Sequence, residues 1–199
     1  MNTISKRESA PFLAELENIY ADMDAVYDRV AQQYAFHCSG CEENCCLTRF
    51  YHHTWAEYFY LRQGFSSLPP DMRKSLKKKA AEVLKKTQKA EEKGLPPRIM
   101  CPLNAENLCT LYRFRPMICR LHGMAHELHP PGRNTVYGPG CEAFTKQTEG
   151  KNYIPFDRTP FYIRLAKLES DLKQAIEIKE KIKMTVAEMI IHFYERNQI

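Results

Sequence analysis

The chain has 199 residues, of which 44% are hydrophobic and eight are cysteine, and it carries a formal net charge of +5 at pH 7. This length and apolar content suit one domain with a packed core, and they exclude a disulfide knot or a low-complexity chain. No segment has the length of a membrane span or the apolar run of a secretory signal, so we expect a cytoplasmic protein without a membrane partner. Thiols stay reduced in the cytoplasm, where a cysteine array is typical of a metal or catalytic site.

Residues 11–36 have the pattern of an amphipathic helix. Their apolar side chains recur every three or four residues: Phe12, Leu16, Ile19, Met23, Val26, Val30 and Tyr34. Pro11 suits the start of a helix, where its missing N–H would have no partner. The following stretch, 37–53, holds the first four cysteines and lacks this period, so we expect a loop.

A short second helix is predicted over 54–62. Thr54 and Glu57 have the spacing of a capping box, in which each residue bonds the backbone of the other. We expect Gly64 to end this helix.

The third predicted helix is rich in lysine. Residues 71–93 hold nine Lys/Arg against four Asp/Glu, which accounts for the whole net charge of +5, and Gly94 marks its end. Most of these lysines lie off the apolar stripe, so we interpret them as a solvated face, with binding to a protein partner as the alternative. The segment has no aromatic residue for base stacking, so nucleic acid is not an expected partner.

The C-terminal part, 159–199, is predicted to be a helical extension. Apolar spacing indicates one helix over 160–183. Thr185 and Glu188 form a second capping box, which opens a last helix over 186–196.

Residues 95–158, between these helices, are rich in proline and have no regular period. Short strand pairings around 110–120 or 134–144 are the sheet structure that we expect. The sequence therefore predicts a single domain over 1–199 of mainly α class. In it, a helical bundle from the N- and C-terminal helices encloses an irregular, loop-rich cysteine module at 38–141, which a metal would hold in place.

All eight cysteines lie in this module: Cys38, Cys41, Cys45, Cys46, Cys101, Cys109, Cys119 and Cys141. Thiolates are soft ligands that favour zinc, copper(I) and iron–sulfur centres. In the Cys38-x2-Cys41 spacing, a tight turn brings two sulfurs onto one ion. Cys45 and Cys46 are adjacent, so both can be ligands only if the backbone bends sharply or if they serve different centres. This favours a polynuclear or two-centre site.

Prolines and arginines surround the later cysteines. Pro102 and Pro116 stiffen the loops that present the sulfurs. Arg115 and Arg120 are expected to offset the negative charge of the thiolates and to donate hydrogen bonds to sulfur.

These cysteine runs resemble a known family. Three segments carry the resemblance: Cys38-x2-Cys41-x3-Cys45-Cys46, Cys101-Pro102-Leu103 and Arg115-Pro116-x2-Cys119-Arg120. They are similar to the YkgJ-type cysteine-cluster proteins, described as zinc- or iron-chelating CxxCxxxCC domains. The resemblance covers about residues 38–141 and implies that the eight cysteines bind metal, but it implies little about activity.

A related cysteine signature occurs in flagellin lysine methylases, which makes a protein-modifying enzyme the alternative function. The chain departs from such an enzyme, because no glycine-rich loop follows a strand to hold a nucleotide-like cofactor. At 199 residues it is also too short for a full barrel enzyme. The sequence identifies no catalytic residue.

The cysteine spacing bears on the choice of metal. Structural zinc sites usually have two Cys-x2-Cys-like pairs, whereas this chain has one pair and irregular later gaps. Irregular gaps and a Cys-Pro step are familiar in iron–sulfur proteins, so we prefer an iron–sulfur cluster of the [4Fe–4S] type, with zinc as the alternative. His122, three residues after Cys119, is the candidate for an extra ligand, and His126 would lie one turn further on if this segment is helical.

The sequence thus predicts a metal-binding protein with a role in redox chemistry, sensing or metal trafficking. Besides the enzyme, a structural zinc domain that presents the lysine-rich helix to a partner is the alternative.

Overall fold

The computed structural model describes residues 6–38 and 45–195. The fold is mainly α, as predicted, with helices and only a few short strands among the described residues. The helices are α1 (Lys6–Tyr34), α2 (Trp55–Ser66), α3 (Pro70–Glu92), α4 (Met117–Leu121), α5 (Glu142–Gln147), α6 (Thr159–Ala175) and α7 (Val186–Glu195). Two 3-10 turns, η1 (Cys45–Leu47) and η2 (Tyr112–Phe114), and four short strands, β1 (Asn104–Ala105), β2 (Leu108–Cys109), β3 (His126–Leu128) and β4 (Val136–Gly138), complete the described elements.

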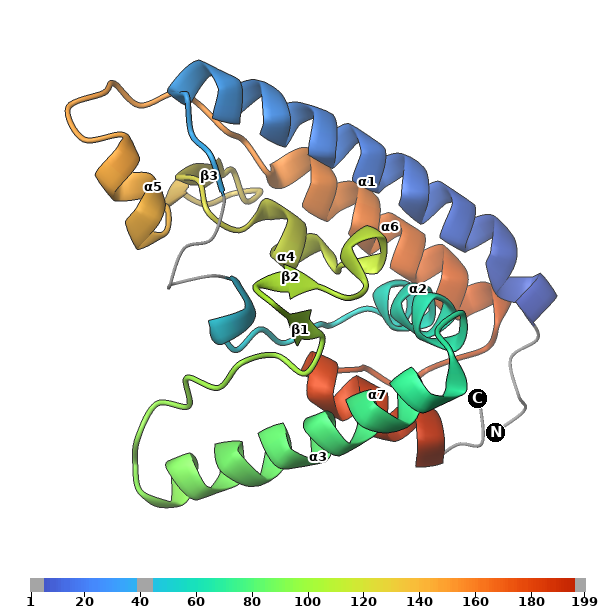
Figure 1. Cartoon of the computed structure of the whole chain (residues 1–199). Coiled ribbons are helices and arrows are strands. Elements are labelled where there is room, and N and C mark those ends of the chain that lie inside the picture. The colour runs from blue at the N-terminus through green and yellow to red at the C-terminus, as the bar shows by residue number, and fades with distance from the viewer. Residues whose placement is uncertain (1–5, 39–44, 196–199) are drawn as a thin grey trace.

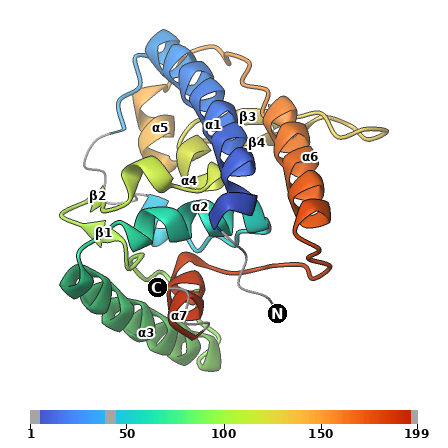
Figure 2. The same ribbon diagram turned by 90° about the vertical axis from the view of Figure 1, so that its right-hand side faces the viewer.

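Two pairs of helices enclose the cysteine segments (Figure 1). α1 packs along α6 on one side of the molecule, and α3 packs along α7 on the other. α2 lies between the pairs and contacts α1, α6 and α7. Figure 2 shows α4, β1 and β2 in the same middle layer. The helices near the two termini (α1, α6 and α7) therefore surround an irregular central region, as the sequence predicted, but they do so together with α3, which comes from within the cysteine module.

α2 is the most buried helix of this middle layer. Nine of its twelve residues are buried, and several are large aromatic side chains. The predicted cap at its start is confirmed, because Thr54 Oγ1 accepts a hydrogen bond from the Glu57 N–H at 3.2 Å.

The predicted end of α2 at Gly64 is wrong, since the helix continues to Ser66. Gly64 is buried against η2, and a Cβ added to it would lie 2.3 Å from Cγ of Phe114. The glycine is required by this close approach of two segments and does not end the helix.

Two other predicted boundaries also differ from the structure. α1 begins at Lys6, so Pro11 lies inside it rather than at its start. α6 ends at Ala175 rather than at 183, because the chain turns at Glu177, which has a φ of +55°. Beyond this turn the chain is not helical but stays packed on the core, where Ile178 and Ile182 are buried.

α7 starts at the predicted capping box. The Glu188 N–H donates to Thr185 Oγ1 at 3.3 Å, and the Thr185 N–H donates to a Glu188 carboxylate oxygen at 2.7 Å. This reciprocal pair satisfies backbone donors that the first turn leaves without partners.

Two small antiparallel hairpins make up the sheet structure of the described residues. β1 pairs with β2, with Asn104 opposite Cys109, and β3 pairs with β4, with His126 opposite Gly138. β4 falls in the predicted range 134–144. The other predicted range, 110–120, forms η2 and α4 instead of strands.

The lysine-rich helix is confirmed as α3, which ends ahead of Gly94. Its lysines are exposed, which fits a solvated outer face. Among the described residues, no helix combines the length and the apolar character that crossing a bilayer requires.

Candidate metal centre

The two cysteine-bearing halves of the module meet through their backbones. The N–H of Cys101 donates a hydrogen bond to the carbonyl oxygen of Cys46 at 2.8 Å. This contact brings η1, which contains the last two cysteines of the first run, against the turn that leads into β1.

Five cysteines line one cavity of about 240 Å³: Cys45, Cys46, Cys101, Cys109 and Cys119. We call these five the cavity thiols. They come from η1, from the turn ahead of β1, from β2 and from α4. No disulfide joins any of the seven cysteines that the structure describes. Cysteines from both halves of the sequence therefore converge as thiols.

Cys46 is the acceptor among the cavity thiols. Hydrogen bonds from the thiols of Cys101 and Cys45 hold the pKa of Cys46 well below its usual range. The same bonds raise the pKa of Cys45 and of Cys101. The Asn104 side chain, whose buried Nδ2 has no other hydrogen-bond partner in the part of the chain that the structure describes, also lowers the pKa of Cys46. These bonds favour the thiolate form of Cys46, which is the form that binds metal.

Main-chain N–H groups support two more of the sulfurs. The Leu103 N–H bonds the sulfur of Cys101, and the Leu111 N–H bonds the sulfur of Cys109. In each case the donor comes two residues after the cysteine and lowers the pKa of its thiol, against the stronger raising effect of burial. Such bonds to sulfur spread the negative charge of a thiolate.

Cys119 is presented by α4, whose start is fixed by a carboxylate from α2. Glu57 is only 5% exposed. One of its oxygens accepts from the Met117 N–H at 2.8 Å and from the Tyr20 hydroxyl at 3.4 Å. Burial and the neighbouring Cys109 raise the pKa of the Cys119 thiol.

Arg115 is the charged side chain beside the cavity thiols. It lines the cavity, and its positive charge lowers the pKa of Cys46 and of Cys109. Its Nε donates to the Tyr112 carbonyl oxygen at 3.1 Å, and its guanidinium lies 3.6 Å from the centre of the Tyr112 ring. This position suits an arginine that offsets the negative charge of the thiolates. That role of Arg115 stays a prediction.

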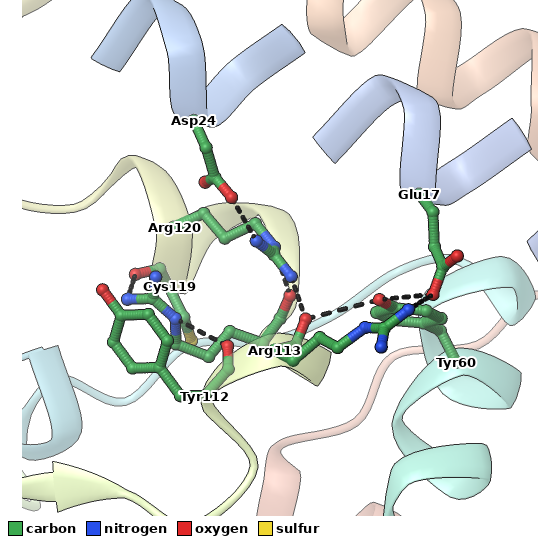
Figure 3. Close-up of polar contacts among 8 residues, drawn as sticks. Glu17, Asp24, Tyr60, Tyr112, Arg113, Cys119 and Arg120 are labelled. Carbon is green, nitrogen blue, oxygen red and sulfur yellow. Dashed lines mark hydrogen bonds and ion pairs between the residues drawn. The ribbon is translucent and has the colours of Figure 1, made fainter. Parts of the chain in front are cut away.

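Arg120 is placed differently, as Figure 3 shows. Its guanidinium donates to Asp24 at 2.7 Å, to the Arg115 carbonyl oxygen at 2.8 Å and to the Arg113 carbonyl oxygen. These hydrogen bonds go to oxygen atoms rather than to sulfur. Arg120 therefore holds the η2–α4 segment against α1.

Two further cysteines lie around Tyr27 rather than in the wall of the cavity. Burial raises the pKa of Tyr27, and the sulfurs of Cys38 and Cys141 raise it further. Cys141 caps α5, and its sulfur accepts from the Phe144 N–H at 3.4 Å. Cys41, the remaining predicted ligand, lies outside the described residues.

His122 interacts with both groups of cysteines, through Tyr27 on one side and Cys46 on the other. Its carbonyl oxygen accepts from the Tyr27 hydroxyl at 3.0 Å, and its ring packs edge-on against Phe50. Burial lowers the pKa of His122, which favours the neutral, ligating form, while the Cys46 thiolate opposes this shift. His126 does not lie one helical turn away, because α4 ends at Leu121 and His126 belongs to β3.

Within residues 6–38 and 45–195, no three His, Cys, Asp or Glu side chains are already close enough to hold a metal ion together. The donor set nevertheless fits a soft metal, because it combines several thiols, one of which favours the thiolate form, and N–H donors to sulfur. Sequence reasoning missed Asn104 as a partner of the thiols and gave Glu57 only a capping role. The position of Asn104, three residues after Cys101, is a local signal that could have been used.

Comparison with protein families gives one match. The model of the family CxxCxxCC, described as "Putative zinc- or iron-chelating domain", matches residues 37–158. No curated protein and no solved structure matches the chain. The matched range includes every cysteine.

Proposed function

The chain belongs to the CxxCxxCC family of zinc- or iron-chelating domains, and we propose that the cavity thiols are the side chains that hold its metal. One observation carries this proposal: five cysteines from four separate segments line a single cavity. Packing alone gives no reason to gather so many thiols, since small apolar side chains would fill the space without the cost of a buried thiolate.

The chemistry of this cavity suits a thiol-ligated metal. The hydrogen bonds that Cys46 accepts lower its pKa, which makes displacement of its proton by a metal easier. Arg115 supplies positive charge next to the sulfurs. Zinc would act here as a Lewis acid, and an iron–sulfur cluster would transfer single electrons.

We infer an iron–sulfur cluster rather than zinc, with a role in redox chemistry or sensing. The ligand spacing is irregular, and the adjacent Cys45 and Cys46 both line the cavity, which suits a centre with several metal atoms. Thiols that face a cavity also differ from a closed structural zinc site, in which protein atoms fill all four positions.

The test is the metal content of protein purified without oxygen. We expect iron, acid-labile sulfide and broad visible absorption, and zinc alone would contradict the choice of cluster. Cys46→Ser is expected to lose most of the metal. Cys141→Ser, at the sulfur beside Tyr27, is the matched comparison and is expected to retain the metal of the cavity. Equal metal content in wild-type protein and Cys46→Ser would contradict the assignment of the cavity thiols.

An enzyme is the second candidate function. The observation in its favour is that the cavity beside the sulfurs also has an apolar wall, where an organic molecule could lie next to the metal. A protein-modifying activity of the methylase kind would require such a neighbouring site.

A further inference from the structure

The cavity that holds the thiols extends between helices that carry no cysteine. Aliphatic side chains of α2, α3, α7 and the segment ahead of Cys101 form this part of its wall: Leu61, Val83, Leu84, Ile99 and Val186. Metal ligation does not need this apolar wall. It offers the kind of surface that binds the body of a small organic molecule.

A buried histidine in the same wall lacks a hydrogen-bond partner. His52 is 2% exposed, lines the cavity, and its Nε2 has no partner among the described residues. Its backbone is fixed by paired hydrogen bonds with Met184, at 2.8 and 3.1 Å. A buried polar atom without a partner destabilises the fold, so a ligand that bonds Nε2 would recover this loss.

The charged groups of the cavity lie around this wall rather than in it. The Arg49 guanidinium pairs with Glu91 at 2.5 Å, Glu188 accepts the Thr185 N–H in the capping box of α7, and Arg115 lies beside the thiols. Burial also lowers the pKa of His52, so its ring is neutral at pH 7. The aliphatic part of the wall therefore offers a hydrogen bond at a neutral group.

We propose that this cavity binds a small, uncharged, largely apolar organic molecule whose single hydrogen-bonding group pairs with Nε2 of His52. The cavity volume of about 240 Å³ is below the roughly 300–1,000 Å³ of sites for drug-sized ligands, which limits the molecule to about two fused rings. Only the ligand's role, as a substrate beside the metal, rests on the proposed function. Binding itself requires only the wall and His52.

The probe is 1-naphthol, which is uncharged, fluoresces and has one hydroxyl group. We expect saturable binding of one molecule per chain to the full-length protein. Naphthalene, which lacks the hydroxyl, should bind about fivefold more weakly, a difference that corresponds to one net hydrogen bond. 1-Naphthoate and naphthalene-1-methylammonium should bind at least tenfold more weakly than naphthol, because both must bury a charge.

Four variants locate the site, one of them as a replacement. Val83→Trp fills the cavity from α3 and should abolish binding of naphthol, whereas Lys85→Trp, on the exposed side of the same helix, should not change it. If Val83→Trp does not fold, Thr87→Phe, at another lining position of α3, replaces it. His52→Phe should remove the fivefold preference for naphthol over naphthalene and retain naphthalene binding.

The proposal is overturned if naphthol does not saturate at one site, if the cavity-filling variant binds as well as Lys85→Trp, or if naphthoate binds more tightly than naphthol. Metal content is measured on the same samples, which separates the two proposals. Metal-loaded protein that does not bind naphthol contradicts only the ligand site. Naphthol binding to protein that takes up no metal supports the ligand site and contradicts the metal function.

Discussion

The adjacent Cys45 and Cys46 illustrate how a local bend allows two neighbouring residues to act together. On extended backbone their side chains would point apart. The 3-10 turn η1 starts at these residues, and both thiols line the same cavity. The sequence indicated that a sharp bend or two centres would be needed, and the structure has the bend. The thiolate form of Cys46 is then favoured because two neighbouring thiols donate to it.

Glu57 supports the cavity indirectly, because its carboxylate fixes the start of α4, the helix that carries Cys119. Glu57→Ala removes the acceptor of the Met117 N–H and leaves this buried donor at the start of α4 without a partner. We expect the free energy of unfolding to fall by about 2–4 kcal/mol, measured by urea denaturation. Metal affinity should also fall, because α4 carries Cys119.

Two controls accompany this prediction. Glu57→Gln keeps a carbonyl oxygen for the Met117 N–H and should lose less stability than Glu57→Ala. Glu142→Ala removes a carboxylate from an exposed pair with Lys146 and should leave both stability and metal affinity unchanged. A Glu57→Ala protein with wild-type metal affinity would show that α4 does not depend on this carboxylate.

At the scale of elements, the features that were predicted correctly depend on neighbours in the sequence. The caps at Thr54 and Thr185 are set by side chains three residues apart. The structure forms the reciprocal box at Thr185, and at Thr54 it forms the Glu57 N–H bond to Thr54 Oγ1, while the Glu57 carboxylate accepts from the Thr54 hydroxyl instead of its N–H. The role of Gly64 depends on Phe114, fifty residues further on, and no local pattern indicates that contact. The end of α6 was predicted too late, because apolar residues such as buried Ile178 continue past the turn at Glu177.

The contact between α2 and η2 gives a test of this non-local role. Alanine usually stabilises a helix relative to glycine, by roughly 0.5–1 kcal/mol. At Gly64 we expect the opposite, a loss of about 1–3 kcal/mol in unfolding free energy, because the new Cβ would overlap the ring of Phe114. The double variant Gly64→Ala/Phe114→Leu should recover part of the loss. Simple addition of the two single effects would contradict the proposed contact.

The β1–β2 hairpin explains why the cysteine spacing looked irregular. Glu106 and Asn107 both have positive φ, at +51° and +65°, so the chain reverses over two residues. The reversal brings Cys109 back towards Cys101, although the sequence spacing of these two cysteines matches no usual zinc-site pattern. Glu-Asn is a weaker turn signal than Asn-Gly, and the strand pairing predicted around 110–120 lies further along the chain than this hairpin.

For the whole molecule, the sequence predicted that distant cysteines meet but not how they divide. Five line the cavity, whereas Cys38 and Cys141 lie by Tyr27. This division depends on the path of the chain around α4 and α5, which spacing does not encode. The enclosing helices are predictable because their apolar stripes are long, and a stripe must be buried against another element.

Removal of the metal should therefore affect the molecule unevenly. The α1–α6 side has its own apolar contacts, with Leu16 and Leu172 fully buried, and it needs no cysteine. The cavity thiols instead connect loops, the β1–β2 hairpin and α4, which are short elements that each bury only one or two apolar side chains, such as Leu103 and Leu121. After anaerobic chelation we expect faster amide hydrogen exchange in 45–52 and 101–121, with α1 still protected. A metal present at about a thousandfold its dissociation constant adds about 4 kcal/mol, so Tm should fall by roughly 10 °C. Loss of protection in α1 to the same extent would mean that the metal holds the whole core, and unchanged exchange would mean that no metal supports the cavity segments.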